Sequence, residues 1–121
     1  MILECSSTSS SIFQISYLLT FNNSSTTNGY QVASSIYRSI NGGTSVNLAG
    51  AGQTLDVTGG RYLFNTYHSS AGNVKYSHNV NIIDQPGAGT INYAVYAIAE
   101  AGSTITVPEF TYKFLSIVKI R

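Results

Sequence analysis

Charge, tryptophan and cysteine are scarce in this sequence. Charged residues make up 9% of its 121 residues, tryptophan is absent, and Cys5 is the only cysteine. One cysteine excludes an intrachain disulfide. A charged fraction so far below the usual value of about 25% removes much of the repulsion that keeps soluble surfaces apart. Because 43% of the residues are hydrophobic, the sequence predicts a folded chain rather than a disordered polar one.

Basic clusters and long apolar runs are also missing. The net charge is +1 and Lys and Arg do not form a run, so the electrostatic footprint of a nucleic-acid-binding protein is absent. The same holds for binding to an anionic membrane. No apolar stretch approaches the ~20 residues of a membrane-spanning helix. We therefore expect neither nucleic acid nor membrane as a partner.

Short alternating segments separated by turn residues run through the whole chain. Phe13 to Phe21 alternates apolar and polar residues, which is typical of a strand with one buried face. Asn41-Gly42-Gly43 and Asp84-Gln85-Pro86-Gly87 are strong turn sequences. Strands are predicted over residues 13–21, 30–40, 45–48, 54–57, 61–67, 74–82, 90–99, 103–107 and 114–120.

This pattern predicts an all-β fold, a two-sheet antiparallel jelly-roll sandwich of about eight strands. Residues 1–11 are expected to form an extended N-terminal lead-in, and residues 12–121 a single jelly-roll domain. A plain immunoglobulin-type sandwich is the alternative, and the lack of tryptophan and of a cysteine pair weakens it.

The final strand, Phe114 to Ile120, is apolar on both faces. Chain ends are usually frayed and polar, so we expect this strand to be central in its sheet and buried twice, in its own core and against another subunit. That expectation favours an assembly protein over an enzyme.

Residues that could support catalysis are few. The five acidic residues are scattered and lie mostly in turns or at strand ends, and the two histidines, His68 and His78, have no neighbouring cysteine that would complete a metal site. The sequence therefore predicts no catalytic, cofactor or metal site. His78 lies on the apolar face of its strand, where a core or subunit-interface role is expected and an ion site on a symmetry axis is the alternative.

Residues from about Ser9 to the end resemble a known family. The features that carry the resemblance are Asp84-Gln85-Pro86-Gly87 after an apolar strand, a strand with a central tyrosine (Tyr93-Ala94-Val95-Tyr96), and the closing Leu115-Ser116-Ile117-Val118-Lys119-Ile120. The sequence resembles the jelly-roll domains found at the C-termini of virion proteins of marine phages and other large DNA viruses, which are similar to the C1q/TNF-like fold. Lys119 stands where that family usually has Glu.

The resemblance implies a homotrimer on the virion, acting as capsid component, decoration or fibre head and contacting other virion proteins. A receptor- or glycan-binding attachment module, or a C1q/TNF-like secreted ligand domain, is the alternative. The residues expected at the subunit interface are Leu115, Ile117, Val118, Ile120, Tyr93, Tyr96 and His78. The residues expected in recognition loops are Asn23, Ser24, Asn41 and Ser70.

Overall fold

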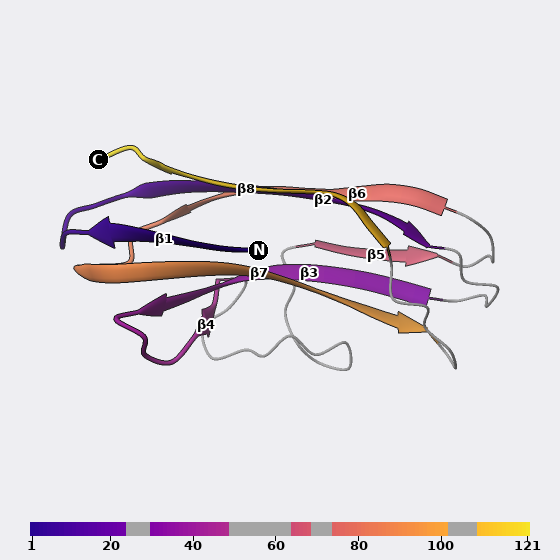
Figure 1. Cartoon of the computed structure of the whole chain (residues 1–121), viewed down its shortest axis with the longest axis horizontal. Helices are drawn as coiled ribbons and strands as arrows, with labels where there is room; N and C mark the ends of the chain where they lie inside the picture. The colour runs from indigo at the N-terminus through magenta and orange to yellow at the C-terminus, as the bar shows by residue number, and fades with distance from the viewer. Residues whose placement is uncertain (24–29, 49–63, 69–73, 102–108) are drawn as a thin grey trace.

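The chain forms two packed antiparallel β-sheets, seen edge-on as two layers in Figure 1. This computed structural model describes residues 1–23, 30–48, 64–68, 74–101 and 109–121. The all-β prediction is confirmed, and the arrangement is consistent with a β-sandwich. The strands are β1 (Ile2–Ser7), β2 (Phe13–Asn23), β3 (Tyr30–Ile40), β4 (Val46–Asn47), β5 (Phe64–His68), β6 (Val74–Asp84), β7 (Gly89–Ala101) and β8 (Glu109–Lys119).

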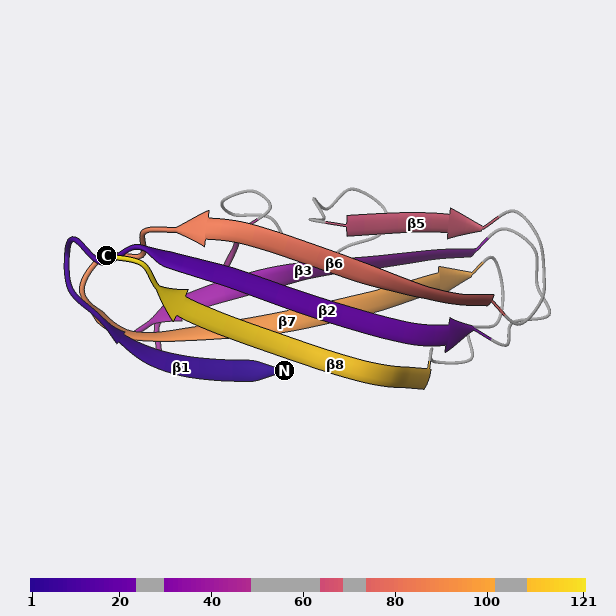
Figure 2. The same cartoon turned by 90° about the horizontal axis from the view of Figure 1, so that it is seen from above.

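One sheet has the order β1-β7-β3-β4, with β5 also paired to β3, and the other has the order β6-β2-β8. All of these pairings are antiparallel. Figure 2 shows the three-stranded sheet lying across the larger one. Strands β2 and β7 are the long central members that carry most of the core.

The core lies between the inner faces of the two sheets. Phe13, Ile15, Tyr17 and Leu19 of β2 are each at most 3% exposed, which confirms the predicted alternation. Because side chains in a strand point to opposite faces in turn, the residues between them point outward. Strands β3 and β7 complete the core from the other sheet with Ile36, Ile91, Tyr93 and Val95.

The Asn41-Gly42-Gly43 turn has the predicted backbone conformation. Asn41 has φ 52° and Gly42 has φ 70°, the positive values of a type I′ turn, and the Gly43 N–H donates to the Ile40 carbonyl at 2.9 Å. The Asn41 side chain accepts a hydrogen bond from the backbone N–H of Thr90 at 2.9 Å. This bond ties the hairpin that follows β3 to the start of β7.

Two expectations about the chain ends need correction. Residues 1–11, predicted as a lead-in, contain strand β1, which pairs with β7 along Gly89–Ala94 and is therefore part of the larger sheet. The final strand is not central: in the described part of the chain β8 pairs with β2 alone and ends its sheet. Apolar residues on both faces do not make a strand central in its sheet, because its place depends on whether both of its edges pair with other strands. The strands predicted at 54–57 and 103–107 lie outside the described residues.

Candidate functional site

The predicted interface residues fall into three groups. His78 and Tyr93 are 0% exposed, so neither side chain has surface to offer a partner, and both must be removed from the interface set. Leu115 and Ile117 are partly buried and pack against the core. Tyr96, Val118 and Ile120 are about half exposed, at 51%, 52% and 53%. Those three side chains are available for contact with another molecule.

The predicted recognition loops are not assembled into one site by the described residues. Ser24 and Ser70 lie outside the described residues. Asn23 ends β2. Asn41 is held in its turn by the hydrogen bond from Thr90, and the turn also brings its side chain against Gly89. The structure therefore assigns Asn41 a part in holding the fold together.

A chain of polar contacts crosses the core at His78. The hydroxyl oxygen of Tyr17 lies 3.0 Å from Ser34 Oγ, which lies 2.7 Å from His78 Nδ1. Each residue comes from a different strand: β2, β3 and β6. All three side chains are almost fully buried. A Ser–His pair at this distance is familiar from nucleophilic catalysis, but no substrate could reach Ser34 Oγ in this position.

Burial also sets the protonation states of this network. Desolvation lowers the pKa of His78 to about 4, so the imidazole is neutral at pH 7 and can accept a hydrogen bond from Ser34. Desolvation raises the pKa of Tyr17 to about 12, which keeps its hydroxyl protonated. The network is thus uncharged at neutral pH and joins the two sheets through the middle of the core.

A second polar cluster joins the sheets at the Asp84 turn. Arg38 Nη1 lies 2.6 Å from Asp84 Oδ1, and the Tyr93 hydroxyl donates to Asp84 Oδ2 at 2.8 Å. Arg38 and Tyr93 belong to the larger sheet, whereas Asp84 ends β6 of the smaller one. Burial and the neighbouring carboxylate both raise the pKa of Tyr93. The acid that opens the Asp-x-Pro-Gly turn therefore clamps the two sheets together.

The outer face of the β6-β2-β8 sheet has no charged residue among its described side chains. The strand register places on this face Ser77, Asn79, Asn81 and Ile83 of β6, Gln14, Ser16, Leu18 and Thr20 of β2, and Phe114, Ser116 and Val118 of β8. Three of these are large exposed hydrophobic residues: Ile83 at 61%, Val118 at 52% and Phe114 at 46%. We call this surface the uncharged face.

Ile83 and Phe114 were missed as candidate surface residues. The signal for Ile83 was available: it follows Ile82, and two consecutive isoleucines in a strand point to opposite faces, so one of them leaves the core. Phe114 was recognised as part of the apolar final strand, but its side could not be assigned without the register to Leu18.

The described residues give little support for a metal site, a membrane-spanning helix or a reactive cysteine. No group of three His, Cys, Asp or Glu residues there could hold a metal ion, and no helix in those segments is long and apolar enough to cross a membrane. Cys5 is partly buried, and burial and the adjacent Glu4 raise the pKa of its thiol. Its thiol is therefore protonated and weakly nucleophilic at neutral pH.

No protein-family model, curated protein or solved structure matches the chain.

Replacing Asp84, which joins the two sheets, should destabilise the fold. Asp84→Ala leaves Arg38 without its partner and the buried Tyr93 hydroxyl without an acceptor, so we expect the free energy of unfolding to fall by roughly 2–4 kcal/mol. Urea unfolding measures the loss. In the double variant Asp84→Ala/Tyr93→Phe the hydroxyl is gone too, so this variant should be less destabilised than the sum of the two single changes. Strict additivity would show that Tyr93 and Asp84 are not coupled.

Protonation of His78 should make stability depend on pH in a defined window. The pKa of His78 is about 4 in the folded chain and about 6.5 when unfolded. Between these values the unfolded chain binds a proton that the folded chain does not. The contribution of His78 to the free energy of unfolding should therefore be constant above pH 6.5, and should fall as the pH drops from 6.5 towards 4. NMR titration of the imidazole in a His68→Gln background measures the pKa directly, and a value near 6.5 would contradict a buried neutral His78.

Proposed function

We propose that this chain is a structural module of a virus particle, a jelly roll that assembles as a homotrimer and acts through shape and burial rather than catalysis. The observation that carries the proposal is the uncharged face, where Ile83, Phe114 and Val118 are exposed in the single chain. A sheet face whose described side chains include three large exposed hydrophobic residues and no charge is typical of a contact surface. It is also a poor surface for a protein that stays alone in solution.

The order of strand pairing supports a jelly roll. β1 pairs with β7, β2 with β6 and β3 with β5, so each pair is nested inside the previous one along the chain. Nested antiparallel pairs arise when a long hairpin is rolled into two sheets, as in a jelly roll. β8 lies outside this series, because it adds to the free side of β2.

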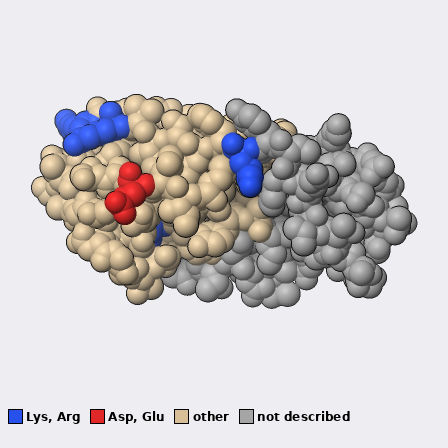
Figure 3. All heavy atoms as spheres, in the orientation of Figure 1, with Lys and Arg blue, Asp and Glu red and all other residues tan. Residues whose placement is uncertain are grey.

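A closed ring of three copies needs two different patches on each copy, because its contacts are head-to-tail. The uncharged face supplies one. The other sheet offers the second on its outer face, where Ile2 is 67% and Tyr96 is 51% exposed. Figure 3 shows the side on which the two layers are seen edge-on, and the charged side chains described there are few and stand apart. A stable interface should bury more than about 1,000 Å².

Placement on a virion, next to other virion proteins, rests on the resemblance carried by the Asp84 turn, the Tyr93–Tyr96 segment and the closing strand. Two of these motifs have clear physical roles in the structure. Asp84 clamps the sheets, and the closing strand supplies Leu115 and Ile117 to the core and Val118 to the surface. A motif of this kind supports a shared fold more strongly than a shared task.

Attachment to a host receptor or glycan is the second candidate, and a secreted ligand domain would use the same kind of surface. The observation that favours recognition is an aromatic pair on the outer face of the larger sheet. The rings of Tyr37 and Tyr96 meet edge to face, with centroids 5.2 Å apart. Tyrosine combines an apolar ring with a hydroxyl and is common at recognition surfaces.

A charge placed on the uncharged face should separate the copies without unfolding them. We expect wild type to have three times the 13.0 kDa mass of the chain, and Val118→Asp to have the mass of one chain. Because Val118 is 52% exposed, the isolated chain should keep its β-sheet circular dichroism. Light scattering at micromolar concentration gives the mass. Thr44→Asp, in an exposed loop, is the control and should remain trimeric. A wild-type mass of 13.0 kDa would sink the trimer.

Binding to a glycan array tests the recognition candidate separately. If the aromatic pair binds a sugar, Tyr96→Ala should abolish array binding, because it removes the exposed ring. Loss of binding together with an unchanged mass would favour attachment by each copy independently. Equal binding by wild type and Tyr96→Ala would show that this pair is not a glycan site.

A further inference from the structure

An open recess of about 280 Å³ lies between the two sheets near the start of β1. It is lined by Met1, Leu19, Val95, Tyr96, Ala97 and Lys113. β1 pairs with β7 only as far as Ala94, while β7 runs on to Ala101 and β8 continues past the start of β1 in Figure 2. The recess lies beside the start of β1, between β7 and β8.

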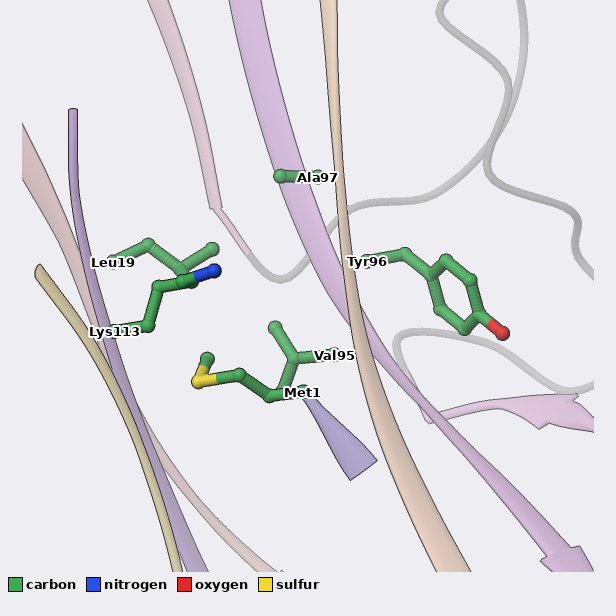
Figure 4. A pocket seen from close by; sticks show the side chains of 6 residues that line it. All are labelled: Met1, Leu19, Val95, Tyr96, Ala97 and Lys113. Carbon is green, nitrogen blue, oxygen red and sulfur yellow. The ribbon is translucent and has the colours of Figure 1, made fainter. Parts of the chain in front are cut away.

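The recess is lined mainly by apolar side chains and by one cationic side chain, that of Lys113. Figure 4 shows Leu19 and Lys113 on one side of it and Met1 and Val95 on the other, while the Tyr96 ring points away. Lys113 pairs directly with Leu19 across β8 and β2, so it occupies an inward-facing position. Its ammonium group points into the recess, towards these apolar side chains.

Lys113 has no ion-pair partner among the residues that the structure describes. The salt bridge found there joins Arg38 to Asp84, which lie in the clamp between β3 and the end of β6. Lys113 is exposed to solvent, so its ammonium group is accessible to a carboxylate of a ligand that enters the recess. Apolar side chains beside the ammonium group allow one ligand to combine an ionic contact with burial of an apolar tail.

We propose that this recess binds an aliphatic monocarboxylate, with the carboxylate on Lys113 and the hydrocarbon tail against Leu19, Val95 and Met1. The Lys113 ammonium group can donate hydrogen bonds to a carboxylate, and the apolar side chains of the recess suit a hydrocarbon tail. The volume is slightly below the range of about 300–1,000 Å³ that holds drug-sized ligands. It suits a short or medium-length chain such as octanoate, which has about ten non-hydrogen atoms.

Another role for Lys113 makes a different prediction. Inward-pointing charges on edge strands protect a sheet against pairing with a second sheet, and β8 is an edge strand in the described part of the chain. If protection were its whole purpose, removing the charge would cause self-association and would leave carboxylate affinity unchanged. The two roles can therefore be separated by measuring binding and mass on the same variant.

Titration of the whole chain with sodium octanoate, followed by calorimetry and by NMR shifts of the Ala97 methyl group, tests the proposal. For a ligand of this size we expect a dissociation constant of about 0.1–5 mM. Lys113→Met should weaken binding by about tenfold or more, because a charge-assisted hydrogen bond is lost. Lys119→Met is the matched control: Lys119 lies on the same strand, outside the recess, and the variant should bind as wild type does.

Two further measurements complete the design. Octan-1-ol has the same tail without the charge, so it should bind wild type about as weakly as octanoate binds Lys113→Met. Ala97→Leu fills the recess and should reduce binding of both ligands. Failure of octanoate to shift Ala97, or equal octanoate affinity in wild type and Lys113→Met, would overturn the proposal. Because the site is formed by one copy of the chain, these outcomes are independent of whether the chain is a trimer.

Discussion

The structure depends on burying the inner face of β2. Phe13, Ile15, Tyr17 and Leu19 lie on one side of a single strand and are almost completely removed from water. A sheet with such a face cannot stand alone, because roughly 1.5–3 kcal/mol of favourable burial is lost for each large side chain left in water. The second sheet covers this face. Within the smaller sheet, β6 and β8 pair with β2 in registers that keep their inward-facing residues on the same side as those of β2.

Covering that face brings polar groups into the core, and each must find a partner. Ser34 and His78 are fully buried, as is Asn47 on the other side of the larger sheet. Ser34 bonds to Tyr17 and His78, while Ser35 donates to Asn47. A buried polar group without a hydrogen bond costs about 1–3 kcal/mol. The bonds of Ser34 to Tyr17 and His78 fix how β2, β3 and β6 meet, and the Ser35–Asn47 bond holds β4 on β3. His78 thus has a structural role where the sequence left a functional one open.

The sequence predicted where the strands lie better than it predicted which strands pair with one another. Alternation located β2 and β6 because each has one apolar face, and Asn41-Gly42 revealed its turn because the backbone there needs positive φ. Sheet order was harder, since it depends on contacts between segments far apart in sequence. The doubly apolar β8 was expected to be central, yet it ends its sheet. Nothing local to β8 indicates which of its edges is paired, and nothing local to His78 indicates that Ser34 lies beside it.

The positions of the few charged residues matter for how the surface of the molecule can be used. Arg38 and Asp84 neutralise each other between the sheets, so they contribute little to the surface. Lys113 points inward from the edge of the same sheet that carries Phe114 and Val118 outward. An edge guarded by an ammonium group resists strand-to-strand pairing, whereas an uncharged outer face does not resist packing. In the proposed assembly, the two sides of β8 would direct contact between copies to the face of the sheet rather than to its edge.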